Sequence, residues 1–191
     1  EMMLKEYLKE IDRKQEKLCG LSDRIWDCPE TAFGEFKSEA ALLEFFKSEG
    51  FEVKEKVYGV DTAFTAEYGS GSPRIGILGE FDALSGLSQV AGVVEKQAAQ
   101  PGACGHGCGH NLLGAGAAAA ALAVKKYLED GHMGTVIYYG CPGEEGGSGK
   151  AFMAKEGAFQ DLDGALTWHP ATVNEVNKDS SLANFQILYQ F

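Results

Sequence analysis

Apolar residues recur at helical spacing in the first fifty residues of the chain. The pattern predicts one amphipathic helix from about residue 3 to the mid-twenties. Its apolar positions are Leu4, Tyr7, Leu8, Ile11 and Leu18. A second helix is expected to have Ser38 as its N-cap, to bury Leu42, Phe45 and Phe46, and to stop at Gly50.

Strand-like and helix-like segments alternate over the rest of the chain. Residues 51–57, 62–68 and 74–80 read as strands, and the last of these is so apolar that it suits a buried central strand. The alternation then continues with a helix over 111–130, a strand over 134–140, a helix over 147–157 and a strand over 164–169. This order predicts an α/β fold, a three-layer αβα domain with a mostly parallel sheet.

Two irregular segments interrupt this alternation. Residues 82–109 form a long glycine-containing loop, and a loop of that length is uncommon in a compact domain unless it builds a site. After Pro170 the chain becomes polar, and residues 182–191 then alternate like a strand. A strand with no partner in view suggests a second domain that has only begun.

Composition narrows the range of partners. The net charge of −11 argues against nucleic acid, because phosphate neutralisation needs clustered Lys and Arg. The most apolar stretch, residues 114–124, is too short to span a bilayer, so no membrane partner is expected. Five cysteines without regular spacing favour a reducing cytosol, and we therefore expect a cytoplasmic protein.

Chemically active side chains follow the buried strands and precede the long helix. Ligands collect at the C-terminal strand ends of open α/β sheets, so these groups are expected to surround one crevice. Thiolate, imidazole and carboxylate together suit zinc or a similar transition metal. The groups are Glu80 and Asp82, the triplet Cys108-Gly109-His110, the pair Glu144-Glu145, and His169.

Each of these signals also has an ordinary structural interpretation. A Cys-x-His triplet in a glycine-rich loop is more often structural than ligating, and adjacent glutamates on a loop are usually only solvated. His169 could be a core histidine bonded to a carbonyl, and Asp82 could cap a turn. However, all four groups lie at strand or helix ends, and this common location favours a shared functional site.

Four motifs, taken together, resemble a known superfamily. They are "GEFDALSG" (79–86), "GHGCGHNLLGAGAAAA" (105–120), "PGEEGGSGKAFMAKEGAF" (142–159) and "ALTWHP" (165–170). In this order they resemble the dinuclear-metal amidohydrolases and metallopeptidases of the aminoacylase and carboxypeptidase G superfamily. The branch they are most similar to holds auxin-conjugate hydrolases and p-aminobenzoyl-glutamate hydrolase. Asn111 and Ser85 stand where many auxin-type relatives carry Asp and Pro, which favours the aminobenzoyl-glutamate side.

The resemblance implies roles for individual residues. Glu144 would be the general base, and Asp82 the carboxylate that orients a ligand. The implied metal ligands are Cys108, His110, Glu145 and His169. They would hold two divalent metal ions, zinc or manganese, with cobalt as a further candidate. His106 falls where relatives have a non-ligand histidine, and Cys104 matches no known position.

The implied reaction is hydrolysis of an amide bond in a small molecule. The substrate would be an N-acyl amino acid, a dipeptide or a p-aminobenzoyl-glutamate-like compound. Two alternatives stay open. One is a metal-binding but inactive fragment or pseudo-enzyme. The other is a thiol redox protein using Cys104 and Cys108, although the chain lacks a CxxC motif.

The resemblance also divides the chain into parts. Residues 1–175 would be the N-terminal part of the catalytic domain. Residues 176–191 would be a connector and the first strand of an inserted α+β lid and dimerisation domain. Relatives then supply one more histidine ligand and the returning strands of the sheet, which we expect beyond Phe191. A homodimer through the lid is therefore implied, and this chain by itself is expected to be poorly active.

Overall fold

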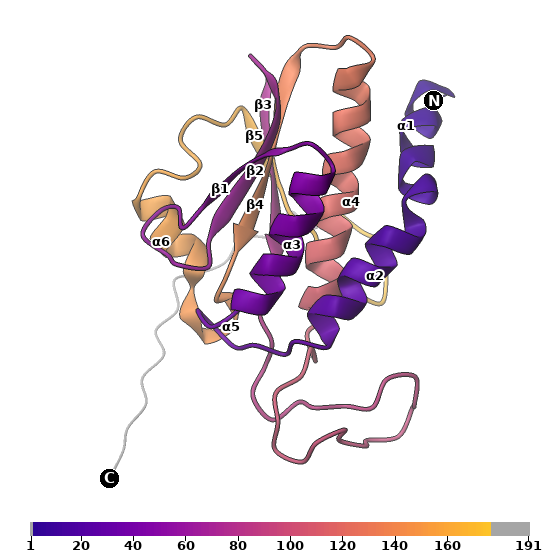
Figure 1. The fold of residues 1–191 in the computed structure, drawn as a ribbon, viewed down its shortest axis with the longest axis vertical. Helices are drawn as coiled ribbons and strands as arrows, with labels where there is room; N and C mark the ends of the chain where they lie inside the picture. Colours follow the sequence, from indigo (N-terminus) through magenta and orange to yellow (C-terminus); the bar gives the residue numbers. More distant parts are fainter. Residues whose placement is uncertain (1, 177–191) are drawn as a thin grey trace.

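The computed structural model describes residues 2–176, which form a mixed α/β fold (Figure 1). The helices are α1 (Met2–Arg13), α2 (Gln15–Trp26), α3 (Phe36–Ser48), α4 (His110–Glu129), α5 (Glu144–Gly147) and α6 (Gly149–Lys155). The strands are β1 (Glu52–Glu55), β2 (Phe64–Ser70), β3 (Arg74–Glu80), β4 (Gly134–Cys141) and β5 (Gly164–Leu166). The strand predicted for residues 182–191 lies outside the described residues.

The five strands form one sheet in the order β1-β2-β4-β3-β5. β3 pairs in parallel with both β4 and β5, whereas β2 pairs antiparallel with β1 and β4. Four strands therefore point the same way and only β2 runs against them. This confirms the prediction of an α/β fold with a mostly parallel sheet.

Helices cover both faces of the sheet (Figure 1). Helices α2, α3 and α4 share one apolar core with one face, and Phe46 at its centre packs on Phe64 and Tyr138. The opposite face packs on α6, where Met153 is buried against Ile137. Gly114 lets α4 approach the sheet closely, since a Cβ atom there would lie 2.8 Å from the carbonyl oxygen of Glu80. The predicted three layers are present.

The prediction of a single helix from residue 3 to the mid-twenties is wrong, because this segment forms two helices. The chain leaves helical geometry at Lys14 (φ −100°, ψ 8°), so α1 and α2 are separate helices. The bend lets α1 lie along α4 while α2 contacts both α3 and α4. The ammonium groups of Lys14 and Lys17 both bind the Glu49 carboxylate at the end of α3, which holds the bend in place.

The predicted cap of the second helix is also wrong. Helix α3 begins at Phe36, and Ser38 lies inside its first turn with its hydroxyl donating to the Cys28 carbonyl at 3.2 Å. The carboxylate of Glu30 accepts the amides of Lys37 and Ser38 instead, at 2.9–3.1 Å. The Glu30 carboxylate, eight residues before Ser38, therefore caps the start of α3 in place of the Ser38 side chain. The predicted stop at Gly50 is confirmed, with φ +78°.

The last predicted strand is shorter than expected, because β5 ends at Leu166 rather than at His169. The indole Nε1 of Trp168 donates to the carbonyl oxygen of Leu113 at 3.1 Å, and its ring lies against Gly116. This contact with α4 draws the chain out of the sheet. The predicted helix over 147–157 is present as α6 (Gly149–Lys155), and the single turn of α5 (Glu144–Gly147) precedes it.

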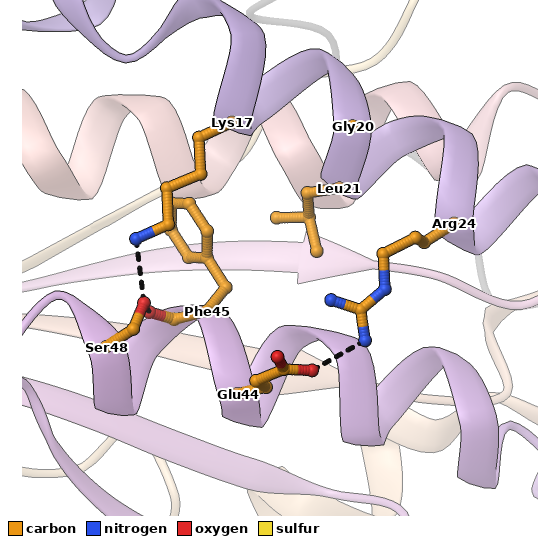
Figure 2. A pocket seen from close by; sticks show the side chains of 7 residues that line it. All are labelled: Lys17, Gly20, Leu21, Arg24, Glu44, Phe45 and Ser48. Atoms are coloured by element: carbon orange, nitrogen blue, oxygen red, sulfur yellow. Dashed lines mark hydrogen bonds and ion pairs between the residues drawn. The ribbon is translucent and has the colours of Figure 1, made fainter.

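A groove between α2 and α3 shares no residue with the strand ends that the sequence singled out (Figure 2). Its two cationic side chains are paired, Lys17 with Ser48 and Glu49, and Arg24 with Glu44. The groove is therefore an ordinary junction between two helices. Within residues 2–176, none of the helices combines the length and the apolar character needed to cross a membrane.

Glu39 on α3 provides a test of the packing. Burial, together with the nearby Glu55 carboxylate, raises its pKa from 4.5 to about 7. The folded state therefore holds a proton that the unfolded state releases, so stability should fall as pH rises from about 4.5 to about 7. Glu39→Gln removes the buried charge, and we expect it to stabilise the fold at pH 8 by about 1–2 kcal/mol. Urea unfolding of both proteins at pH 5 and pH 8 measures this; a gain as large at pH 5 would contradict it.

Candidate metal centre

The register of the parallel strands brings distant loops together. Glu80 at the end of β3 lies opposite Cys141 at the end of β4. Asp82 therefore follows β3 beside the turn that follows β4, and this turn carries Glu144 and Glu145. The N-terminus of α4, which begins at His110, lies at the same edge. The sheet thus collects the groups that the sequence placed at separate strand ends.

Asp82 links two of these groups and is almost completely buried. Its Oδ1 lies 2.9 Å from Nδ1 of His110, and its Oδ2 accepts the backbone amide of Glu145 at 2.8 Å. Because an ionised carboxylate can only accept, Nδ1 of His110 carries the proton. The Nε2 lone pair is then free to bind a cation, which is the usual arrangement of a carboxylate behind a metal-ligating histidine.

Nε2 of His110 is buried and has no hydrogen-bond partner among the described residues. It lies 3.1 Å from Oε2 of Glu80, and 3.9 Å from a carboxylate oxygen of both Glu144 and Glu145. A lone pair facing three carboxylates is unfavourable unless a proton or a metal ion lies between them. A divalent cation fits this arrangement.

Cys108 and His169 form the exposed side of the cluster. The thiol Sγ of Cys108 lies 3.3 Å from Nε2 of His169. Nδ1 of His169 donates to the carbonyl oxygen of Pro170 at 2.9 Å, so its Nε2 is also the nitrogen with a free lone pair. The ligand atoms of Cys108, His110 and His169 lie within 4.8 Å of one another. The same is true of the group formed by Glu80, His110 and Glu144.

The glutamate pair lies in a turn of irregular geometry. Gly143 has a left-handed φ of 62°, and Gly146 has a φ of 75°. Between them, Glu145 adopts an extended ψ of 94°, which breaks the helical repeat after Glu144. The turn brings both carboxylates to His110 although the two residues are adjacent in the chain.

The acidic surroundings disfavour negative charge in the absence of a cation. Burial and the Glu80 carboxylate raise the pKa of Glu144. Burial and Glu145 raise the pKa of the Cys108 thiol to about 12. Burial by itself would lower the pKa of His110, but the carboxylates of Asp82, Glu80 and Glu145 raise it. A metal ion would reverse this balance, because a coordinated thiol is deprotonated outright.

The donors suit a transition metal better than magnesium or calcium. Sulfur and imidazole nitrogen favour zinc and related ions, and the additional carboxylates suit a site that leaves room for water or substrate. The residues that could hold metal are Cys108, His110, Glu145 and His169, with Glu80 and Glu144 at the same cluster. The raised pKa of Cys108 also argues against the redox alternative, since a reactive cysteine needs a lowered pKa.

Glu80 was expected at this crevice without an assigned role, and Lys150 was not expected there; both lie at the cluster. Oε2 of Glu80 is the carboxylate oxygen nearest to Nε2 of His110, and its other oxygen binds the ammonium of Lys150 at the start of α6. In the sequence, Glu80 is recognisable only as a polar residue at a strand end. The signal for Lys150 is its place in the first turn of the helix that follows the glutamate pair.

The neighbouring His106 and Cys104 do not belong to either group of candidate ligands. His106 is buried, and its Nε2 donates to the carbonyl oxygen of Ile25 at 2.9 Å, near the end of α2. Cys104 is a free, half-buried cysteine.

The fold and the cluster define a class: an α/β protein with a candidate transition-metal centre at the C-terminal edge of its sheet. The sequence profile of peptidase family M20/M25/M40 matches residues 77–182, which include every residue of the cluster. The chain belongs to this family, and the resemblance seen in its motifs is confirmed.

Individual relatives are similar over most of this chain. It is 51% identical to one of the subunits of p-aminobenzoyl-glutamate hydrolase from Escherichia coli (strain K12), over 95% of this chain and 38% of the relative. It is 33% identical to Xaa-Arg dipeptidase of Mus musculus, over 91% of this chain and 39% of the relative. The chain thus spans about two fifths of the length of the curated relatives it matches.

Solved structures share the fold. The structure of a Bacillus subtilis protein, described as a dinuclear metal binding peptidase from the M20 family, superposes with a TM-score of 0.67 at 20% identity. The match covers 81% of this chain and 42% of the Bacillus protein. At 20% identity, this superposition shows that the described domain shares the fold, and it shows nothing further.

Proposed function

We propose that the protein carrying these residues is a metal-dependent amidohydrolase. Residues 1–175 are the N-terminal part of its catalytic domain, and 176–191 lead into a lid and dimerisation domain. The metal ligands in this chain are Cys108, His110, Glu145 and His169. The observation that carries the proposal is the buried, unpartnered Nε2 of His110, which Asp82 orients toward three carboxylates.

Two divalent ions bound here, zinc or manganese, would supply Lewis acidity that makes water more acidic and polarises the scissile carbonyl. Glu144 is the general base: its carboxylate takes a proton from the attacking water and passes it to the leaving amine nitrogen. Without a metal ion, burial and the Glu80 carboxylate raise the pKa of Glu144, which disfavours its charged form until a cation is bound.

Asp82 acts through its two hydrogen bonds. It holds His110 in the tautomer that leaves Nε2 free, and it fixes the backbone of Glu145 at the same time. One carboxylate thereby sets the position of two ligands that are 35 residues apart in the chain. Such supporting groups usually contribute 10- to 100-fold, roughly, to metal affinity or activity.

The proposed substrate is a small molecule in which an amide joins an acyl group to an amino acid. p-Aminobenzoyl-glutamate is the first compound to test, because the relative at 51% identity is named for its hydrolysis. Dipeptides are the next, since a second relative is named Xaa-Arg dipeptidase. Metal analysis beside these assays distinguishes an enzyme from a metal-binding protein without turnover.

Substitution of individual cysteines and histidines tests the assignment of the metal ligands. Cys108→Ser and His110→Ala are each expected to lower the bound zinc, because each removes a ligand. The matched control Cys104→Ser is expected to keep it. Elemental analysis after dialysis against limiting zinc provides the measurement. Equal loss of zinc from all three variants would contradict the assignment and favour a structural cysteine site.

A further inference from the structure

A segment with no assigned role, residues 28–36, lies against both loops of the candidate metal centre. We refer to it as the support segment. The carbonyl oxygen of Glu30 accepts the backbone amide of Ala83 at 2.7 Å, next to Asp82. At the other end of the segment, the carboxylate of Glu35 accepts the backbone amide of Gly143 at 2.8 Å, next to Glu144. The segment thus contacts the chain beside both loops.

Glu35 is completely buried. Its Oε2 accepts the hydroxyl of Thr62 at 3.1 Å, while its Oε1 accepts the Gly143 amide. Thr62 is itself fully buried, so the carboxylate is held from both sides. A buried carboxylate is costly unless its oxygens accept hydrogen bonds, and here one of those bonds goes to the backbone of the glutamate turn.

Phe33 provides a second contact between the support segment and the same turn. It has a left-handed φ of 63°, a conformation that costs a bulky L-residue about 1–2 kcal/mol. A Cβ atom at Gly143 would lie 2.7 Å from its ring, and one at Gly147 would lie 2.8 Å from it. The turn therefore wraps closely around the Phe33 ring. Backbone strain of this kind tends to occur where the surrounding structure serves a site.

We propose that Glu35 is a positioning residue for the candidate metal centre. Its carboxylate, anchored by Thr62, holds the Gly143 amide and so sets the turn that presents Glu144 and Glu145 to His110. Removal of the carboxylate leaves the Gly143 amide buried without its acceptor, and the turn must shift to solvate it. The consequence for metal binding rests on the proposed function, whereas the consequence for the turn does not.

The test compares three variants of the whole protein. Glu35→Ala removes both acceptor oxygens. Glu35→Gln keeps one carbonyl oxygen for the Gly143 amide, and its NH2 group can donate to the Thr62 hydroxyl oxygen. Glu39→Gln is the matched control. Glu39 is a buried carboxylate about one helical turn after Glu35. The charged groups near Glu39 lie in the support segment and in residues 55–61.

Zinc affinity, measured by competition with a chromogenic chelator, is the first readout. Glu35→Ala is expected to weaken zinc binding about tenfold, as loss of a supporting hydrogen bond commonly does. Glu35→Gln should restore most of the affinity, and Glu39→Gln should match the wild type although it alters stability. If Glu35→Ala lowered only the melting temperature and bound zinc like the control, Glu35 would be a structural residue and the proposal overturned.

Hydrogen exchange of the peptide spanning residues 142–149, measured without metal, is the second readout. Faster exchange in Glu35→Ala, but not in Glu35→Gln or Glu39→Gln, is the expected result and shows that the carboxylate holds the turn; the positioning role requires the weaker zinc binding as well. Unchanged exchange overturns it, whatever the zinc result. A wild-type protein that binds no zinc would instead count against the proposed function, and the exchange data would still decide whether Glu35 holds the turn.

Discussion

In the full-length protein that carries these residues, Glu144→Gln is expected to lower kcat for hydrolysis of p-aminobenzoyl-glutamate by about 10²–10⁴ while the bound metal stays unchanged. The amide has nearly the shape of the carboxylate but cannot take a proton from water. The adjacent backbone, held through the Gly143 amide and by Asp82, has no reason to move. Steady-state kinetics and elemental analysis of the same preparation measure the two quantities.

Two companion variants make this result specific. Glu145→Gln should lose metal affinity as well as turnover, because this residue is the proposed ligand of the pair. Glu156→Gln, an exposed glutamate just after α6, should change neither. Near-normal turnover in Glu144→Gln would mean that another residue is the base, and Glu80 would then be the first to examine, because it also lies close to His110.

Asp82→Asn is expected to weaken zinc binding by about 100-fold although only one oxygen is replaced by an NH2 group. The remaining oxygen can accept the Glu145 amide, which turns the NH2 group toward Nδ1 of His110. Nδ1 must then accept a hydrogen bond, and the ring proton moves to Nε2, where it blocks the metal. If the new side-chain amide takes the opposite rotamer, its NH2 group faces the backbone N–H of Glu145, and two donors then face each other. Either arrangement disturbs one of the two proposed ligands.

The control for this variant is Asp163→Asn. Asp163 also accepts a backbone amide, that of Arg74 at 2.7 Å, but it lies before β5 and away from the cluster. We expect this control to bind zinc like the wild type, with competition titrations at one pH as the measurement. Equal affinities for Asp82→Asn and the wild type would show that Asp82 does not set the tautomer of His110.

The sequence by itself was sufficient for the order of the elements and for most of the candidate donors. Strand β4 contains no charged residue and α4 presents a face of small residues, so both follow from local spacing. Parallel strands end at a common edge, which is why polar residues after separate strands could be expected to converge. The motifs around Cys108 and Glu144 added the resemblance to the family that the comparison then confirmed.

Only the tertiary structure decided the contacts that link remote segments. The break at Lys14 and the early end of β5 both depend on partners in other elements, Glu49 and the carbonyl oxygen of Leu113. Lys150 and its partner Glu80 are 70 residues apart in the chain. Glu35 and Gly143 are separated by 108 residues. Hydrophobic periodicity reports which face of an element is buried, but it carries no information about which distant polar group a buried carboxylate will meet. The contacts of Glu35, Glu80 and Lys150 therefore became visible only when the sheet had placed their segments side by side.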